Sequence, residues 1–244
     1  MMISKEEIKQ IKSLKLKKFR KEKSLFIVEG PKMLKEAIAY APQNIKTIYY
    51  TESSILDLDI SNFNSELITE KELNQISCLK QPQGIVTICN YLPSPSKGSE
   101  FKIALDNIQD PGNMGTILRL AAWFGVTEIL ASTNCVDIYN PKVVQASMGA
   151  IFNVQVNYLA LSDFFELNKL PVYGAMLSGD NIYKSKLSPK GILLMGNEGN
   201  GVSDKLQKYI SKPLYIPKFG QGESLNVAMA TGIMLSEFCR EDKK

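Results

Sequence analysis

The sequence contains no histidine, and this absence removes a large set of enzyme mechanisms. Ser–His–Asp and Cys–His catalysis both need an imidazole as general base, so both are excluded. The four cysteines (Cys78, Cys89, Cys135 and Cys239) include no close pair, which excludes zinc sites and C-x-x-C redox motifs. An enzyme with this sequence must therefore handle protons with Asp, Glu, Lys, Arg, Tyr or substrate groups, and we expect no metal.

Long hydrophobic runs are also missing. No apolar stretch approaches the ~20 residues that a membrane-spanning helix needs, and the N-terminal sequence MMISKEEIKQ has no apolar signal-peptide region. A chain of 244 residues with 44% hydrophobic and 22% charged residues can bury a core, either as one large domain or as two small ones. We therefore predict a cytoplasmic protein that does not associate with membranes.

Arginine is scarce, because only Arg20, Arg119 and Arg240 occur among the 29 basic residues. A guanidinium binds planar anionic groups in a way that lysine cannot, so each arginine is a candidate functional residue. Basic residues are concentrated at the start of the chain: residues 1–35 hold eleven Lys/Arg against four Asp/Glu. This pattern favours an RNA or DNA partner, although a solvent-exposed Lys-rich helix face would look the same.

The first ninety residues predict a compact α/β unit that is followed by a linker. The stretch LPSPSKGSE at residues 92–100 contains two Pro, one Gly and three Ser without periodicity, which is typical of a domain boundary. We therefore predict one domain over residues 1–91 and another over residues 101–244. Before the linker, helices are predicted over residues 3–20 and 32–40 and from residue 70, and strands over residues 24–28, 45–51, 67–69 and 83–89.

After the linker, strands alternate with helices, which predicts a mostly parallel sheet covered on both faces. Ligands of such sheets bind at the carboxyl ends of the strands. Three polar loops follow strands at that edge, over residues 106–115, 196–201 and 219–226. Strands are predicted over residues 101–105, 128–131, 154–156, 172–176, 191–195 and 214–216, and helices over residues 116–124, 143–148, 161–167 and 203–210 and after the third loop.

The glycines of these loops do not form a nucleotide-binding motif. The second loop reads GNEGNG, which has the spacing G-x-x-G-x-G rather than G-x-G-x-x-G, and no phosphate-binding P-loop is present. The third loop ends in Ser224 and Asn226, which are both good N-cap residues, so we expect the last helix to begin at one of them. The chemistry must therefore be sought in a different constellation.

Three stretches resemble the motifs of the SpoU (TrmH-like) RNA 2′-O-ribose methyltransferases of the SPOUT superfamily. They are DNIQDPGNMGTILRLAAWFGV, LLMGNEGNGVS and IPKFGQGESLNVAMATGIMLSE, in the family's order and spacing over residues 103–238. The N-terminal stretches KKFRKEKSLFIVEGPKMLKEA and LKQPQGIV resemble the small substrate-binding domain that many members carry. The resemblance implies a C-terminal domain with a deep trefoil knot, S-adenosylmethionine as cofactor and a homodimer.

The resemblance further implies methylation of a ribose 2′-hydroxyl in RNA. Ribosomal RNA is the expected substrate, because the N-terminal half resembles the substrate-binding domains of members that act on rRNA. Three alternatives remain: a tRNA 2′-O-methyltransferase, a non-catalytic RNA-binding or ribosome-assembly protein with the same fold, and an unrelated protein that binds a nucleotide at the sheet edge.

By resemblance, Arg119 engages the 2′-hydroxyl or an adjacent phosphate. It lies six residues after Asn113, near two helical turns on, so it can face the same loop edge. Because the pKa of arginine lies above ~12, we expect Arg119 to stabilise developing negative charge rather than to act as a base. The remaining catalytic candidates are Asn113, Glu198, Ser224 and Asn226.

Each candidate also has a purely structural alternative. Arg119 could form a surface ion pair, and Asn113 could serve only to form a turn. Glu198 could be a solvated turn residue, and Ser224 and Asn226 could only cap a helix.

The resemblance also assigns cofactor-binding and RNA-binding residues. Backbone groups of Gly196, Ile216 and Leu225 are expected to hold the cofactor, with Asn197 and Gly201 in the same glycine-rich loop and Leu177 and Ser178 as a further wall. A basic patch in the first domain is expected to contact RNA phosphates without reading sequence. Its members are Lys17, Lys18, Arg20, Lys21 and Lys23.

Overall fold

The computed structural model describes residues 3–54, 58–93 and 99–240. The chain forms two compact units: Met1–Ser94 with Asp137–Asn153, and Pro95–Val136 with Val154–Lys244. We call them the N-terminal unit and the C-terminal unit. The predicted domain bounds, 1–91 and 101–244, stay a prediction, and residues 94–98 of the linker between them lie outside the described residues. The return of residues 137–153 to the N-terminal unit was not predicted from the sequence.

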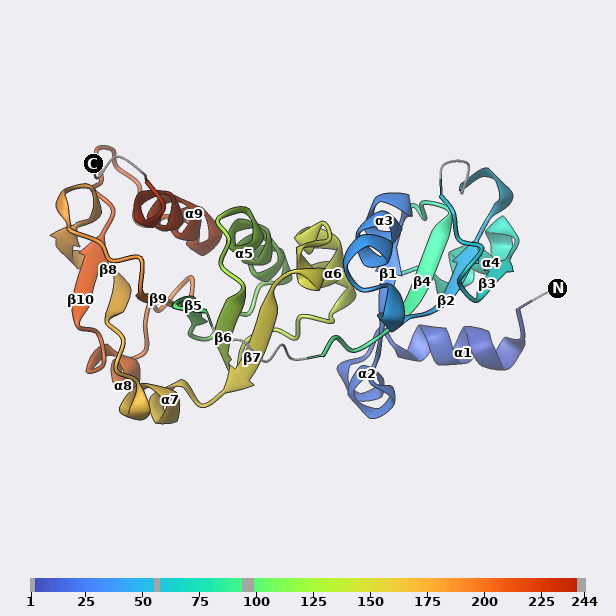
Figure 1. The fold of residues 1–244 in the computed structure, drawn as a ribbon, viewed down its shortest axis with the longest axis horizontal. Helices are drawn as coiled ribbons and strands as arrows, with labels where there is room; N and C mark the ends of the chain where they lie inside the picture. The colour runs from blue at the N-terminus through green and yellow to red at the C-terminus, as the bar shows by residue number, and fades with distance from the viewer. Residues whose placement is uncertain (1–2, 55–57, 94–98, 241–244) are drawn as a thin grey trace. The chain divides into compact units, whose positions relative to one another are not determined.

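The N-terminal unit contains a four-stranded sheet in the order β1-β4-β2-β3. Strand β4 pairs antiparallel with β1 and β2, while β2 pairs parallel with β3. Apolar side chains of α1, α4 and the sheet, including Ile11, Leu73 and Val86, form one buried cluster. The elements, shown in Figure 1, are α1 (Lys5–Ser13), α2 (Lys17–Lys23), β1 (Leu25–Glu29), α3 (Pro31–Tyr40), η1 (Pro42–Asn44), β2 (Ile45–Tyr50), η2 (Glu52–Ser54), β3 (Ser65–Leu67), α4 (Glu70–Ile76) and β4 (Ile85–Asn90).

The prediction of one helix over residues 3–20 is wrong, because α1 ends at Ser13 and α2 begins only at Lys17. Leu16 has extended backbone angles between them, with φ −99° and ψ 130°. The Arg20 guanidinium donates from Nη1 to the carbonyl oxygens of Leu14 and Lys15, at 2.9 Å each. A helix end leaves carbonyl groups without partners, and Arg20 satisfies two of them at this break.

The segment 137–153 carries α6 (Pro141–Ser147) and η3 (Ala150–Phe152) and packs within the N-terminal unit. Aromatic rings hold it there: the Tyr139 ring stacks on Tyr91 at 3.9 Å and lies 4.7 Å from the Phe26 ring. The Tyr139 hydroxyl also accepts a hydrogen bond from the Leu92 backbone N–H at 3.0 Å. These long-range contacts have no periodic signature in the sequence, which explains why the prediction missed them.

The C-terminal unit contains a six-stranded sheet in the order β10-β8-β9-β5-β6-β7. Every pairing in this sheet is parallel, which confirms the predicted parallel α/β architecture. Strand β9 is buried along its whole length, as expected for an apolar strand in the middle of such a sheet. The elements are β5 (Phe101–Leu105), α5 (Pro111–Trp123), β6 (Glu128–Ser132), β7 (Gln155–Leu159), α7 (Leu161–Leu167), β8 (Val172–Asn181), η4 (Ile182–Lys184), β9 (Gly191–Met195), α8 (Asp204–Gln207), β10 (Lys212–Tyr215) and α9 (Val227–Phe238).

Two helix starts bear on the site. The side chain of Asn226 accepts from the backbone N–H groups of Ala228 and Met229, which confirms Asn226 as the N-cap of α9. Helix α5 begins at Pro111 rather than at residue 116, because Asp110 caps it and proline is favourable at the first helical position. Asn113 therefore lies in the first turn of α5.

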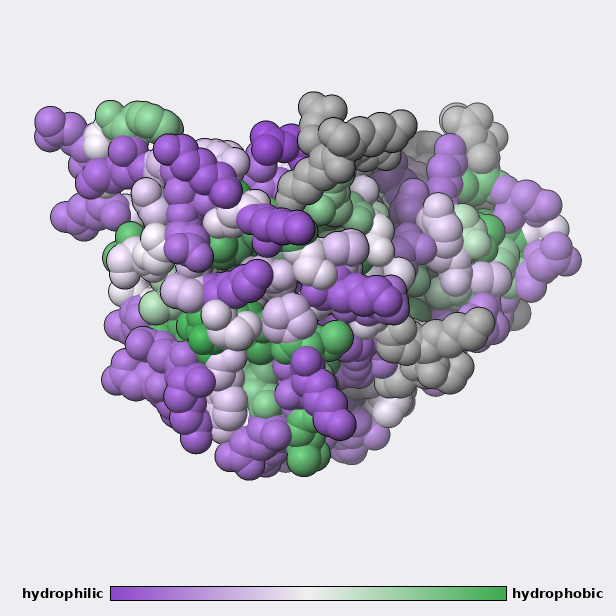
Figure 2. Space-filling model, turned by 60° about the vertical axis from the view of Figure 1, so that its left-hand side comes forward, coloured by the Kyte–Doolittle hydropathy of each residue, from purple (hydrophilic) through white to green (hydrophobic). Residues whose placement is uncertain are grey.

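Figure 2 brings the left-hand side of Figure 1 forward, and hydrophilic side chains cover most of that face, with hydrophobic ones visible between them. In the part of the chain that the structure describes, no helix is long and apolar enough to cross a membrane. The trefoil knot that the motifs imply stays a prediction.

Candidate active site

Asn113 links the three polar loops of the C-terminal unit. Its Nδ2 donates to Glu198 Oε1 at 2.8 Å, and its Oδ1 accepts from Asn226 Nδ2, also at 2.8 Å. Glu198 and Asn226 lie 85 and 113 positions from Asn113 in the sequence, so only the fold brings the three together. The structure thus joins three of the five predicted catalytic residues in one hydrogen-bonded chain.

This chain of hydrogen bonds has a fixed direction. Asn226 Oδ1 accepts from the backbone N–H groups of Ala228 at 2.9 Å and Met229 at 3.3 Å. Since the oxygen of Asn226 is committed to the helix, its Nδ2 must face Asn113. Asn113 then presents its oxygen to Asn226 and its Nδ2 to Glu198, whose carboxylate serves as the final acceptor.

The loop after β9 is folded by its own polar groups. Asn197 Oδ1 accepts from the Gly199 and Asn200 backbone N–H groups at 3.0 and 3.1 Å, and Asn197 Nδ2 donates to the Asn107 carbonyl at 2.9 Å. A Cβ atom on Gly196 would lie 2.2 Å from the Gly201 backbone, so only glycine fits there. Asn197, predicted to contact cofactor, therefore ties the second loop to the first loop.

Three residues that the sequence prediction missed support the first loop. Asp106 is 3% exposed and accepts from the Ser203 backbone N–H at 2.8 Å. Asn107 adopts a left-handed backbone with φ 61°. Cys135 Sγ accepts from the Ile108 N–H and donates to the Leu105 carbonyl, both at 3.3 Å, and burial raises the pKa of its thiol, so it stays protonated. The position of Asp106 directly after a predicted strand was the available signal for it.

Arg119 lies on α5 two turns beyond Asn113 and is exposed to solvent. It makes no hydrogen bond or ion pair with any residue that the structure describes. Glu198 is the acidic residue among the catalytic candidates. One of its carboxylate oxygens accepts from Asn113, and the other accepts from Asn197 Nδ2 at 3.2 Å. The surface ion pair that we considered for Arg119 is therefore not observed, and its guanidinium is available for a ligand.

The predicted cofactor wall is open to solvent. The pairing of β8 with β10 jumps from Pro213↔Gly174 to Leu214↔Asp180, so residues 175–179 are looped out of the strand register. Leu177, in this bulge, is 86% exposed, and Leu225, next to the cap of α9, is 53% exposed. Ser178 and Ser224 are exposed and make no side-chain hydrogen bond to a described residue. Exposed apolar side chains beside free hydroxyls fit a ligand with an apolar ring and polar substituents.

The RNA-binding patch needs one correction. Lys17, Lys18, Lys21 and Lys23 are exposed on α2, as a contact with RNA would require. Arg20 is only 2% exposed, and its Nε and Nη2 donate to Asp137 Oδ2 at 3.1 and 2.7 Å. The prediction that Arg20 contacts RNA is therefore wrong: all its donor nitrogens are used inside the N-terminal unit. No group of three or more potential metal ligands occurs in residues 3–54, 58–93 and 99–240.

Taken together, the fold and the site define an α/β protein whose C-terminal unit has a parallel sheet, with a candidate site built from three loops at the carboxyl ends of its strands. Residues 100–236 match the SpoU rRNA Methylase family, and residues 5–87 match the MRM3-like substrate binding domain. The chain belongs to the SpoU rRNA methylase family.

Comparisons over the full length agree with this assignment. The chain is 29% identical to the 23S rRNA (guanosine(2553)-2′-O)-methyltransferase RlmP of Bacillus subtilis, over 94% of each chain. A solved TrmH-family structure from Porphyromonas gingivalis is 34% identical, with a TM-score of 0.87 over 98% of each chain. The AdoMet-bound rRNA methyltransferase from Sinorhizobium meliloti is 28% identical, with a TM-score of 0.88 over 100% of this chain and 99% of that one.

Proposed function

We propose that this protein transfers the methyl group of S-adenosylmethionine to a ribose 2′-hydroxyl of ribosomal RNA, in the cytoplasm. The observation that carries the proposal is the hydrogen-bonded chain Glu198–Asn113–Asn226, together with an exposed Arg119 on the same helix as Asn113 that makes no hydrogen bond or ion pair to a described residue. Each of these residues comes from one of the three family motifs. Relatives named as rRNA 2′-O-methyltransferases, and a relative solved with AdoMet bound, support the same function.

The exposed residues at the strand ends fit the cofactor. Leu177 and Leu225 offer apolar surface for an adenine ring, and the backbone of Gly196, at the end of β9, supplies polar groups for its edge. When bound, the cofactor supplies an electrophilic methyl group on a sulfonium cation. The residues of this chain must then position the ribose hydroxyl in line with that methyl group and stabilise the charge that develops on its oxygen.

Arg119 and Glu198 have different parts in this scheme. The guanidinium of Arg119 is free to donate to the 2′-oxygen or to the adjoining phosphate, and charge-assisted hydrogen bonds of this kind are the strong ones. Each carboxylate oxygen of Glu198 already accepts from an amide, Asn113 on one side and Asn197 on the other. Glu198 therefore acts as a positioning residue that holds the first two loops together.

A methyl-transfer assay tests the proposal. The protein is incubated with radiolabelled S-adenosylmethionine and total RNA from a strain that lacks the gene, and the RNA is then separated by size. We expect label in large rRNA, with one position resistant to alkaline cleavage. Label in tRNA would support methyl transfer to RNA but would show that tRNA, not rRNA, is the substrate. Absence of label on both RNA and ribosomal particles, together with absence of cofactor binding in calorimetry, would favour the non-catalytic alternative.

Substitutions of Asn226 can separate its role as the cap of α9 from its hydrogen bond to Asn113. In Asn226→Asp, a carboxylate still caps α9 but cannot donate to Asn113, so stability should change by less than about 0.5 kcal/mol. Without this hydrogen bond the first and third loops should be misaligned. The rate of methyl transfer should then fall on the order of 10-fold to 10²-fold. Asn226→Ala should lose the same activity and also about 1 kcal/mol of stability.

Thermal melts and initial rates measure both effects. Asn140→Asp is the matched control, because Asn140 caps α6 through the Lys142 N–H and lies outside the three motif loops. It should keep both stability and activity. Full activity in Asn226→Asp would show that the direction of the hydrogen bonds is irrelevant to function.

The homodimer belongs to the same proposal, and α5 and α9 supply a surface for it. The two helices run side by side (Figure 1): Asn226 meets Asn113 near their starts, and Cys239 Sγ lies 3.9 Å from the Phe124 carbonyl at their ends. Trp123, 83% exposed, and Met229, 62% exposed, project from this helix pair into solvent. Exposed apolar surface of this kind is typical of protein–protein interfaces.

Trp123→Glu tests this surface. A buried carboxylate without a partner is costly, so the variant should dissociate into single chains. Sedimentation should give the wild type at twice the chain mass of 27.2 kDa and the variant at 27.2 kDa. Leu167→Glu, another substitution of a highly exposed apolar residue in the same unit, is the control and should sediment like the wild type. A wild type that sediments only as single chains at micromolar concentration would contradict the dimer.

A further inference from the structure

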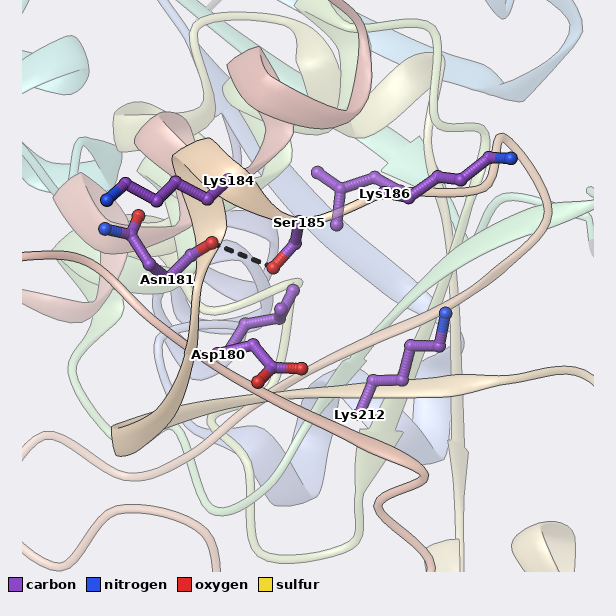
Figure 3. A pocket seen from close by; sticks show the side chains of 8 residues that line it. Asp180, Asn181, Lys184, Ser185, Lys186 and Lys212 are labelled. Carbon is purple, nitrogen blue, oxygen red and sulfur yellow. Dashed lines mark hydrogen bonds between the residues drawn. The ribbon is translucent and has the colours of Figure 1, made fainter.

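A pocket of about 450 Å³ opens beside the carboxyl end of β8 and the edge strand β10. It is separate from the three motif loops that form the candidate active site. Leu187 and Leu214 are buried and form an apolar part of its lining, while lysine side chains surround it. Figure 3 shows this pocket with Asp180, Ser185, Lys184, Lys186 and Lys212 around it.

The lining carries an excess of positive charge. Three lysines, Lys184, Lys186 and Lys212, and one acidic residue, Asp180, are among the residues that line it. None of the three lysines forms an ion pair with a described residue, whereas Lys102 and Lys190 of the same unit pair with Glu128 and Glu100. Three cations around a concavity that holds one carboxylate leave an excess of positive charge there, which attracts anions.

The arrangement of the cations indicates an extended ligand. In Figure 3, Lys184 lies beside Asn181 on one side of the pocket, and Lys186 and Lys212 lie on the other side. Cations on two sides of a pocket suit the successive phosphates of a nucleic-acid strand.

The position of the pocket connects it with the proposed reaction. Asp180 follows the bulge that contains Leu177 and Ser178, and Leu214 stands two residues before Ile216. The pocket thus shares two strand ends with the residues assigned to the cofactor. On these grounds, and resting on the proposed function, we propose that Lys184, Lys186 and Lys212 bind the phosphodiester backbone of the substrate RNA close to the methylated nucleotide.

The test compares two triple variants with the same change in charge. One is K184A/K186A/K212A, and the control is K169A/K205A/K208A, whose lysines lie in the same unit but outside the pocket. Binding to a single-stranded oligo(U) RNA is measured over a series of salt concentrations. The pocket variant should bind about tenfold more weakly, and the slope of log K against log salt should fall by about 0.7 for each phosphate that the variant no longer binds. The control should stay close to the wild type.

The outcomes separate the pocket from the proposed function. Equal weakening of RNA binding in both variants would mean that only the net charge matters. It would contradict the proposal that the pocket binds RNA. Loss of S-adenosylmethionine binding in calorimetry with unchanged RNA binding would assign the pocket to the cofactor and overturn it too. If the wild type transferred no methyl group but the pocket variant lost RNA affinity, the proposed function would be wrong. The proposal that the pocket binds RNA would be confirmed. Lys212→Gln alone, which keeps a long polar side chain, repeats the test should the triple variant fold poorly.

Discussion

Replacement of Arg119 by alanine should lower kcat for methyl transfer by roughly 10²–10³-fold while cofactor affinity changes less than about twofold. Arg119 is exposed and lies two helical turns beyond Asn113, with no partner among the residues that the structure describes. A guanidinium that stabilises no part of the fold can be removed without a large effect on stability. Single-turnover kinetics and calorimetry on the folded variant measure the two quantities separately.

Two further arginine variants sharpen this prediction. Arg119→Lys keeps the charge but loses the planar fork, so its rate should fall between those of the wild type and Arg119→Ala. Arg240→Ala is the control, because Arg240 is exposed and pairs with Glu237, at the C-terminal end of α9. Normal turnover of Arg119→Ala on the true RNA substrate would remove Arg119 from the catalytic group.

For Arg20, the large effect is expected on stability. Arg20→Met should destabilise the N-terminal unit by about 3–5 kcal/mol, because it leaves the Asp137 carboxylate without its partner in a largely buried position. It also leaves the Leu14 and Lys15 carbonyls without their donor at the break between α1 and α2. Urea unfolding followed by circular dichroism measures the loss, and faster hydrogen exchange in β1 and α6 locates it.

The double variant R20M/D137L tests the cause. Since both charges are gone, it should recover a substantial part of the stability that Arg20→Met loses. Lys21→Ala, beside Arg20 on the exposed side of α2, should stay within about 0.5 kcal/mol of the wild type. A loss in Arg20→Met no larger than that in Lys21→Ala would mean that the buried ion pair contributes little to this fold.

The parts of the structure that could be predicted from the sequence depend on local signals. Alternating strands and helices predicted the parallel sheet of the C-terminal unit, and strand pairing confirms it. Asn226 caps α9, as one of two predicted caps, because a cap depends on a residue and its neighbours up to three positions on. The start of α5 has a local signal in Asp110–Pro111, although the predicted start falls five residues late.

The two arginines show where the sequence reaches its limit. Both Arg20 and Arg119 stand in basic or motif-bearing stretches, and the sequence assigned both to RNA. Arg20 is a buried structural residue because Asp137, more than a hundred residues away, approaches it at 2.7 Å. No local property of either arginine predicts whether a carboxylate that is distant in the sequence will pair with it in the fold.

By itself, the sequence determined the chemical class of this protein: no imidazole, no metal ligands in motif spacing, and three motif loops that follow strands of one parallel sheet. Only the tertiary structure decided how the polar groups are used. It directed the amides of Asn226 and Asn113 toward Glu198 and returned residues 137–153 to the N-terminal unit. It also placed three lysines around a pocket without an ion pair to any described residue. The physical reason is that capping and periodicity act over a few residues, whereas hydrogen-bond partners and counter-charges are chosen by packing between distant segments.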